Sequence, residues 1–284
     1  LTIQITMKKA FLLILLVLLF VPTFSQESED YPVRIFETSI LIDNQTVTTP
    51  FKGMLEFEIH HRFGAVNNGF DDLFGLWGPG NIRLGLNYAI TDKLVIGVGT
   101  AKSYMAQDVS VKYALLRQTE SGSTPVSVAL YGNMGIDLRS KDNFGSAAQD
   151  WREIHRLNYF SQVLVAKQFS RVSLQVAPTF IYFNAVEEGH KNANFGLSAG
   201  AKVSLFGSHS LILEYDQLFT KQKNPEFDAK PQFAAGWEIG TVTHAFQIFL
   251  ANYHEILGQY NFLYNQNSIS DFNYLLGLNI TVRF

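Results

Sequence analysis

Charged and polar side chains at every second position carry the clearest chemical signal in the sequence. Glu56, Glu58, His60 and Arg62 alternate with apolar residues in one short stretch. Successive side chains of an extended strand point to opposite faces, so these four would share one face. Such a face can form ion pairs or line a path for water and small polar solutes. Later stretches place further charges of both signs in the same phase: Arg83, Lys112, Asp137, Arg156, Lys202, Glu214, Asp216, Glu238 and Arg283.

Patterns that could support catalysis or metal binding are weaker. Residues 196–200 read G-L-S-A-G and fit the G-x-S-x-G nucleophile pattern, which requires a sharp strand-to-helix turn. Here the pattern lies inside an alternating stretch, so we expect Ser198 to be structural and the protein not to be an enzyme. His60 and His61 would point to opposite faces of a strand and cannot bind one metal ion together. The other histidines are dispersed, so we expect no metal site and no cofactor.

The elements that position these residues are best defined at the C-terminus, where residues 272–284 read F-N-Y-L-L-G-L-N-I-T-V-R-F. Every second residue is apolar, and mostly polar residues lie between. A chain end usually frays unless it is paired into a ladder. A strand in a closed membrane barrel is paired, with lipid outside and a polar lumen inside. The final Phe284 resembles the C-terminal signal of Gram-negative outer-membrane β-barrels, which implies recognition by the barrel assembly machinery.

The same alternation recurs along the chain in segments that turn residues separate. We expect about twelve antiparallel strands, an even number typical of such barrels. Short and longer linkers alternate between the segments, which places both termini on one side of the membrane, the periplasmic side. The expected strands are 55–63, 81–89, 94–101, 108–117, 125–138, 155–169, 172–183, 194–205, 210–217, 231–240, 244–252 and 272–284.

The N-terminal region has the features of a cleavable signal peptide. Lys8 and Lys9 precede an apolar run from residue 10 to 21, and small residues follow at Thr23 and Ser25. We expect residues 1–25 to be the signal peptide, with translation starting at Met7. The run is shorter than the roughly 20 residues of a membrane-spanning helix. Residues 26–53 are expected to form a periplasmic lead-in that either folds into the lumen or stays a free tail, and residues 54–284 the barrel.

Composition agrees with an exported barrel. The absence of cysteine excludes disulfides and thiolate metal sites. Loss of Lys8 and Lys9 takes the basic residues from 22 to 20 against 25 acidic ones, a net charge of −5. Because no basic face is present, we expect no nucleic-acid partner. The aromatic content of 14% suits the girdles of a membrane barrel, and the mean hydropathy of +0.05 suits strands with one apolar and one polar face.

Beyond the C-terminal signal, several stretches resemble an uncharacterised family of outer-membrane β-barrels of Gram-negative bacteria, a domain of unknown function. They are residues 43–46 (D-N-Q-T), 56–59 (E-F-E-I), 81–88 (N-I-R-L-G-L-N-Y) and 183–189 (F-N-A-V-E-E-G). The resemblance implies an all-β, antiparallel transmembrane barrel in contact with outer-membrane lipid. It supplies no catalytic residue.

Three functions remain open from the sequence. The first is a structural barrel stiffened by internal ion pairs, or a narrow channel for a small polar solute. The second is a binding platform for a periplasmic or surface partner. The third, which the sequence favours least, is an outer-membrane lipid esterase. The first outer loop, residues 67–77, combines carboxylates with bulky apolar residues and could fold over the mouth of the barrel.

Overall fold

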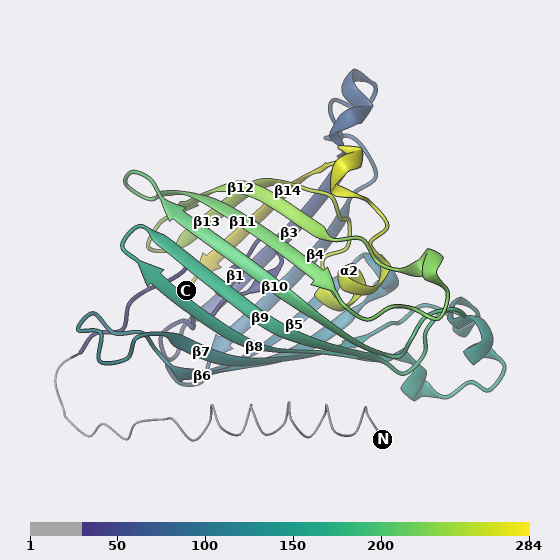
Figure 1. The fold of residues 1–284 in the computed structure, drawn as a ribbon, viewed down its shortest axis with the longest axis horizontal. Coiled ribbons are helices and arrows are strands. Elements are labelled where there is room, and N and C mark those ends of the chain that lie inside the picture. The colour runs from purple at the N-terminus through teal and green to yellow at the C-terminus, as the bar shows by residue number, and fades with distance from the viewer. Residues whose placement is uncertain (1–29) are drawn as a thin grey trace. The chain divides into compact units, whose positions relative to one another are not determined.

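Within residues 30–284, which the computed structural model describes, twelve strands pair in chain order into a closed antiparallel barrel (Figure 1). The expected signal peptide lies outside the described residues. The barrel strands are β3 (Leu55–Ala65), β4 (Asn81–Ala89), β5 (Leu94–Ala101), β6 (Gln107–Leu116), β7 (Ser127–Ile136), β8 (Leu157–Phe169), β9 (Val172–Phe183), β10 (Ala193–Ser204), β11 (His209–Leu218), β12 (Gln232–Gly240), β13 (His244–Ala251) and β14 (Leu275–Arg283).

Pairing of the last strand with the first closes the cylinder. β14 runs antiparallel to β3, with Ile280 opposite Ile59. Beyond the strand, Phe284 and Leu55 exchange both backbone hydrogen bonds, at 2.9 and 3.1 Å. The expected all-β barrel of about twelve strands is therefore confirmed. The terminal strand starts three residues later than expected, because Phe272 has a positive φ of 51° in the turn after η6 (Ile269–Asp271).

Along most of each strand, side chains alternate between a buried and a more exposed face. In β14 the buried set includes Asn279, Thr281 and Arg283, and the residues between them are half-buried and apolar. The outward faces of neighbouring strands carry exposed apolar side chains such as Leu86, Ile96, Val111, Leu213 and Ile248. An apolar outer wall around a polar interior is the arrangement of a β-barrel in lipid. None of the helices described is both long enough and apolar enough to cross a membrane.

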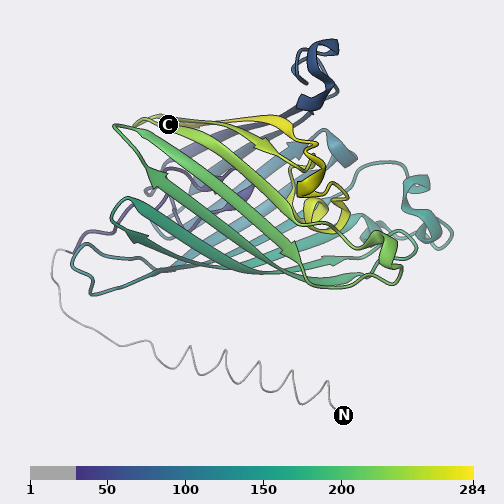
Figure 2. The same ribbon diagram turned by 45° about the horizontal axis from the view of Figure 1, so that its top comes forward.

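Tight turns join the strands at the end where Phe284 lies, and longer loops join them at the other end (Figures 1 and 2). A small hairpin of β1 (Ile40–Leu41) and β2 (Asn44–Gln45) precedes the barrel. The loops carry the helical elements: η1 (Val66–Asp71), η2 (Ser103–Met105), η3 (Lys141–Ala148), η4 (Glu153–Arg156), η5 (Pro225–Phe227), α2 (Gly258–Tyr264) and η6.

The apolar outer wall leads to a prediction that distinguishes a barrel surface in contact with lipid from one in contact with water. Ile248 lies in the middle of β13 with 53% of its surface exposed. Replacing it by arginine (Ile248→Arg) should lower the free energy of unfolding in vesicles by about 2–4 kcal/mol, because the charge would face hydrocarbon. On a water-facing surface the same change costs within about 0.5 kcal/mol. Urea titration in vesicles measures the difference.

The matched control for this prediction is Val242→Arg. Val242 is 88% exposed but lies in the turn between β12 and β13. This variant should unfold at the same urea concentration as the wild type. Equal stability of Ile248→Arg, Val242→Arg and the wild type would show that water covers the barrel wall.

Candidate functional site

Two segments of the chain itself occupy the barrel interior. The N-terminal plug, residues 32–50, includes the β1–β2 hairpin and packs Ile35, Phe36 and Leu41 against inward-facing wall residues such as Leu164 and Ile212. The C-terminal plug, residues 253–265, includes α2 and packs against a second part of the wall. The lumen is therefore filled from both directions. Within residues 26–53, for which a lumen segment and a free tail are both open from the sequence, the residues from Ile35 to Val47 pack against the inner wall.

Glu214 and Asp216 of β11 hold the tip of the N-terminal plug. The backbone N–H groups of Asp43 and Asn44 donate to Glu214 Oε2 at 3.1 and 3.0 Å. The Asn44 side chain donates to Asp216 Oδ1 at 2.7 Å, and its own oxygen accepts from the Ser198 hydroxyl at 3.0 Å. The hairpin tip is thus held by two wall carboxylates.

Further polar contacts fix the rest of the N-terminal plug to other strands. The backbone N–H of Ile42 donates to the Gln247 side-chain oxygen. Asn279 Nδ2 donates to the Ile42 carbonyl oxygen at 2.6 Å. Arg62 forms an ion pair with Asp43. Other contacts with the plug include Lys112 Nζ to the Ser39 carbonyl (2.8 Å), Ser39 Oγ to Glu56 (2.5 Å), Val47 N to the Gln175 amide oxygen (2.9 Å), Arg283 to Glu37, and Lys202 Nζ over the Phe36 ring (6.0 Å). Arg283 also donates to Glu56 of the wall at 3.1 Å.

Other inward charges pair within the wall. Arg83 donates to both carboxylate oxygens of Asp108 at 2.8 and 2.9 Å, and its third contact is Glu58 at 3.4 Å. Glu238 accepts from Gln247 at 2.8 Å. His60 Nε2 lies 3.6 Å from Glu58, beyond hydrogen-bond distance. A narrow space of about 30 Å³ beside His60 is lined by residues of both plugs, so the two plugs meet there.

The C-terminal plug is held more by apolar packing. Leu257, Phe262 and Leu263 are buried against wall residues that include Phe160 and Ile181. A few polar contacts add to this packing. Gln259 donates to Asn133 and Asn158, at 3.0 and 2.9 Å, and Asn158 donates to the Tyr260 hydroxyl at 2.9 Å. Tyr253 donates to Glu214 at 2.8 Å, so this carboxylate contacts both plugs.

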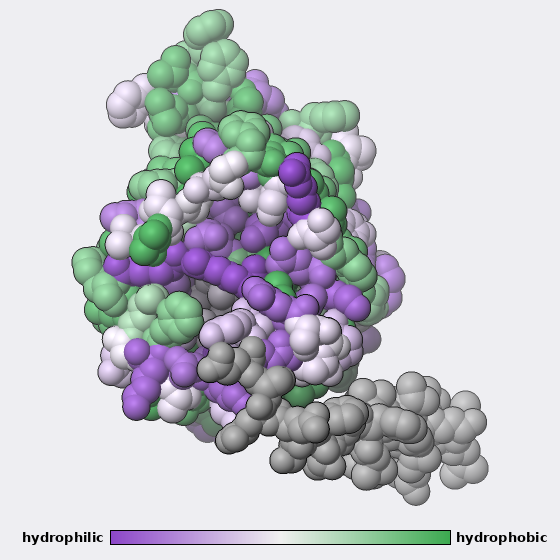
Figure 3. Space-filling view, turned by 90° about the vertical axis from the view of Figure 1, so that its left-hand side faces the viewer, coloured by the Kyte–Doolittle hydropathy of each residue, from purple (hydrophilic) through white to green (hydrophobic). Residues whose placement is uncertain are grey.

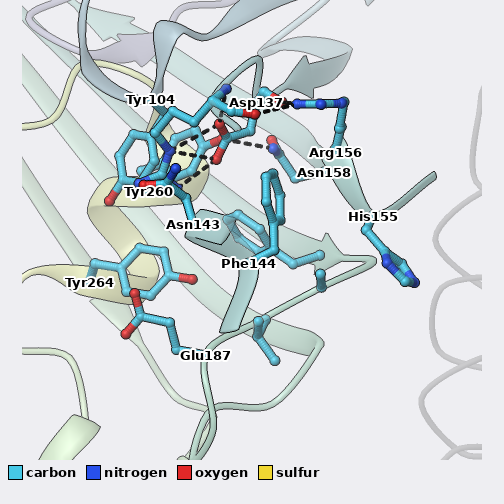
Figure 4. Close-up of a pocket in the computed structure, with 14 residues that line it drawn as sticks. Tyr104, Asp137, Asn143, Phe144, His155, Arg156, Asn158, Glu187, Tyr260 and Tyr264 are labelled. Atoms are coloured by element: carbon cyan, nitrogen blue, oxygen red, sulfur yellow. Dashed lines mark hydrogen bonds and ion pairs between the residues drawn. The ribbon is translucent and has the colours of Figure 1, made fainter. Parts of the chain in front are cut away.

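A cluster of aromatic and charged side chains covers the C-terminal plug at the loop end (Figure 4). Arg139 pairs with Asp137 at 2.7 Å and lies over the Tyr104 ring, which stacks on Tyr260 at 3.9 Å. Burial raises the pKa of the Tyr104 and Tyr260 phenols above their usual value, so both are neutral. The space left between these side chains is about 30 Å³. The cluster therefore leaves little free space beside the C-terminal plug.

The G-L-S-A-G stretch forms part of the wall surface that contacts the two plugs. It lies inside β10, and its two glycines and its serine share the inward face. A Cβ on Gly196 would come within 2.6 Å of the Phe262 ring, and one on Gly200 within 2.9 Å of Leu41. The Ser198 hydroxyl contacts the amides of Gln162 and Asn44. The motif therefore makes room for one residue of each plug, and no histidine is among the hydrogen-bond partners of Ser198.

Larger spaces lie at the two ends of the barrel. At the turn end, a cavity of about 260 Å³ is bordered by Arg34, Phe51, Arg117 and Arg283. Figure 3 shows that hydrophilic atoms dominate the centre of this end and hydrophobic atoms its rim. At the loop end, a depression of about 1040 Å³ is lined by charged and amide residues, including Asp150, Arg152, Glu187 and Asn224. In the part of the chain that the structure describes, no three histidine or carboxylate residues are placed to hold a metal ion.

The structure places the predicted inward-facing residues as follows. Glu56, Glu58, His60, Arg62, Arg83, Lys112, Asp137, Lys202, Glu214, Asp216, Glu238 and Arg283 are all buried, and Phe284 is exposed. Arg156 is the exception among the predicted inward-facing residues. It is not on a strand but at the end of η4, half-buried, where it pairs with Glu153 and donates to the carbonyls of Asp137 and Arg139. The strand begins one residue later, at Leu157.

Sequence reasoning missed the C-terminal plug. Residues 253–271 are the long linker between the expected strands 244–252 and 272–284, yet Tyr253, Ile256, Leu257 and Phe262 are buried. The density of apolar and aromatic residues in a supposed loop was the available signal, since solvated loops seldom need them. The first outer loop was also misplaced. It projects sideways from the barrel instead of covering its mouth (Figure 1).

Solved structures resemble this chain at low sequence identity, each of the three below at a TM-score under 0.5. A NanC porin shares 9% identity, with 81% of this chain and 98% of that chain covered and a TM-score of 0.47. An outer membrane channel from Pseudomonas putida F1 shares 12% identity over 92% of this chain and 100% of its own, at a TM-score of 0.47. LpxR from Salmonella typhimurium shares 12% identity, with 81% of this chain and 99% of that chain covered and a TM-score of 0.39. These likenesses carry none of those proteins' activities over to this chain.

No curated protein matches the sequence. The model of one family, described as a membrane bound beta barrel domain, matches residues 36–284. This range takes in most of the N-terminal plug, the twelve strands that the structure describes and the C-terminal plug. The chain therefore belongs to the membrane bound beta barrel domain family DUF5777.

Proposed function

We propose that the protein is an outer-membrane channel for small polar solutes that is closed at rest, and that the N-terminal plug is its gate. In this proposal the chain is exported by a cleaved signal peptide, the barrel assembly machinery recognises the strand ending at Phe284, and both termini face the periplasm. Passage between the cavity at the turn end and the depression at the loop end would also require a shift of the C-terminal plug, which Tyr253 links to Glu214.

One observation carries the proposal: the barrel is complete without its N-terminal plug. Each barrel strand is hydrogen-bonded to two neighbouring strands, and β1 and β2 pair only with each other. The plug backbone is held mostly by wall side chains such as Glu214, Gln247 and Asn279. Water can replace these polar contacts when the plug moves, whereas it cannot replace a strand in lipid. A plug held in this way can leave without opening the wall.

The charge pattern of the wall also supports passage of a polar solute. With the N-terminal plug displaced, Glu56, Lys112, Glu214 and Arg283 would lose their plug partners and face the lumen together. Rings of mixed charge attract water and polar solutes of either sign. Arg83 and Asp108 keep each other as partners, so part of the wall stays neutralised.

A permanently sealed structural barrel is the second candidate. The observation that favours it is the C-terminal plug, which is tethered at both ends by β13 and β14 and buries Phe262 and Leu263 almost completely. In this candidate neither plug moves, and the internal contacts only stabilise the barrel. The two candidates make opposite predictions for conductance.

Locking the plug to the wall tests the gate. The chain has no cysteine, so the pair Asn44→Cys/Ser198→Cys can be joined by a short thiol-reactive crosslinker that reduction cleaves. These two side chains already contact each other across the plug and β10. In a planar bilayer under applied voltage, we expect the wild type to show openings, the crosslinked pair none, and the reduced pair openings again.

The control pair Gln162→Cys/Ser198→Cys joins two wall residues whose side chains are also in contact. Crosslinking it should leave the openings unchanged. A wild type that stays silent at every voltage, or openings that persist in the crosslinked Asn44→Cys/Ser198→Cys pair, would rule out the proposed gate.

A larger side chain at the contact between β10 and the N-terminal plug should favour the open channel. In Gly200→Ile the new side chain needs the space that Leu41 now fills, so the N-terminal plug should be destabilised by about 1–3 kcal/mol. Since 1.4 kcal/mol is tenfold in an equilibrium constant, the open probability should rise roughly 5- to 150-fold. Single-channel recording measures this rise.

Ala201→Ile is the matched control for Gly200→Ile. Ala201 is the next residue of β10 and lies on its outward face, away from the plug. The Ala201→Ile variant should have the same open probability as the wild type. If Gly200→Ile folds, as judged by a boiling-dependent shift in gel mobility, and its openings do not increase, then the plug does not gate the barrel.

A further inference from the structure

The loop between β3 and β4 exposes an unusual number of large apolar side chains. We call residues 66–77 the lateral finger. In it Phe70, Leu73, Phe74, Leu76 and Trp77 are between 39% and 85% exposed. Phe272, on the adjoining loop before β14, is 76% exposed, and a backbone hydrogen bond from Val66 to Tyr274 holds the two loops together. Six neighbouring apolar side chains in water would be costly, so the patch indicates a contact surface.

The lateral finger extends away from the barrel wall. In Figure 1 it is the blue segment above the strands, beside the yellow loop that precedes β14. In Figure 3, which views the molecule from the turn end, a group of mostly hydrophobic atoms stands above the rest of the barrel. The finger therefore points sideways, toward the region that surrounds the barrel in a membrane.

Several backbone groups of the lateral finger are hydrogen-bonded within the finger. The N–H groups of Phe74 and Trp77 donate to the carbonyls of Gly69 and Asp72, at 2.5 and 3.0 Å. The N–H of Gly75 donates to the Asp72 carboxylate at 2.7 Å, and the same side chain accepts from Asn68. A segment that enters an apolar phase needs such internal bonds, because no water is there to replace them.

The charge and the backbone conformation of the lateral finger also fit a segment that enters an apolar phase. The finger contains no lysine or arginine, and one of its two carboxylates, Asp72, is used inside the loop. Leu73 and Phe74 both adopt positive φ, 55° and 57°, a conformation that costs free energy for large side chains. The finger thus presents its apolar side chains outward with little charge among them.

We infer that the lateral finger, with Phe272, inserts into the lipid bilayer beside the barrel and anchors the loop end of the protein in the membrane. Continuity with the lipid-facing wall favours lipid as the occupant. The finger joins β3 and β4, whose outward faces carry Phe57, Ile59, Leu84 and Leu86. Aromatic side chains such as Phe70 and Trp77 are the residues typical of membrane interfaces. The inference does not depend on the proposed gate.

The three tryptophans of the chain make the test possible. Trp77 reports on the finger. Trp237 lies on the outward face of β12, between Leu211 and Ile248, and reports on lipid. Trp151 lies in a loop beside Phe144 and Arg156 and reports on the aqueous loop end. Replacing two tryptophans by phenylalanine at a time gives three full-length variants with one fluorophore each.

Each variant is folded into phosphatidylcholine vesicles with and without brominated acyl chains. We expect brominated lipid to quench Trp77 and Trp237 about twofold or more, as for side chains that reach the acyl boundary. Iodide added to the water should quench Trp151 and leave Trp77 unchanged. Trp77 quenched by iodide and not by brominated lipid would overturn the inference. Trp77 protected from both quenchers, with protection that falls as protein is diluted in lipid, would also overturn it and indicate a second copy of the chain.

Discussion

Closure of the backbone hydrogen-bond ladder is the constraint on which the rest of this structure depends. A strand edge in hydrocarbon would leave a row of polar groups without partners, and each would cost several kcal/mol. Pairing of β14 with β3 removes both edges that the sheet would otherwise have, and the exchange between Phe284 and Leu55 carries that pairing to Phe284. Once the ladder is closed, the outward face must be apolar and the inward face is free to be polar.

The polar inner face creates a second requirement, because charges shielded from bulk water need partners. The wall supplies some of them itself, as Arg83 and Asp108 show. The others come from the N-terminal plug, whose backbone N–H groups and side chains meet Glu214, Asp216 and Gln247. A lumen segment from its own chain thus supplies partners to many inner-wall charges, whereas Glu58 Oε1, Arg62 Nε and both His60 ring nitrogens have no hydrogen-bond partner among the described residues.

The two plugs differ in how they are held, and this difference shapes the proposed function. The N-terminal plug has one end joined to the barrel and many polar contacts with several strands. The C-terminal plug is joined at both ends and rests on an apolar cluster around Phe262 and Leu263. Glu214 contacts both through Asn44 and Tyr253, so movement of one plug changes the surroundings of the other. The glycines of the G-L-S-A-G stretch provide room for one residue of each.

The sequence by itself determined the barrel, because a period of two and the alternation of short and long linkers are local features. Strands such as β4, β5 and β9 have the bounds expected from that period, and Glu56, Lys112 and Glu214 are buried as their phase predicts. Only the tertiary structure decided what those residues contact. Asn44 and Glu214 are 170 positions apart, and no local pattern relates them. The same holds for the inward fold of α2, for Arg156 outside its expected strand and for the direction of the lateral finger. Each depends on packing between distant segments, whereas strand phase depends only on neighbours in the chain.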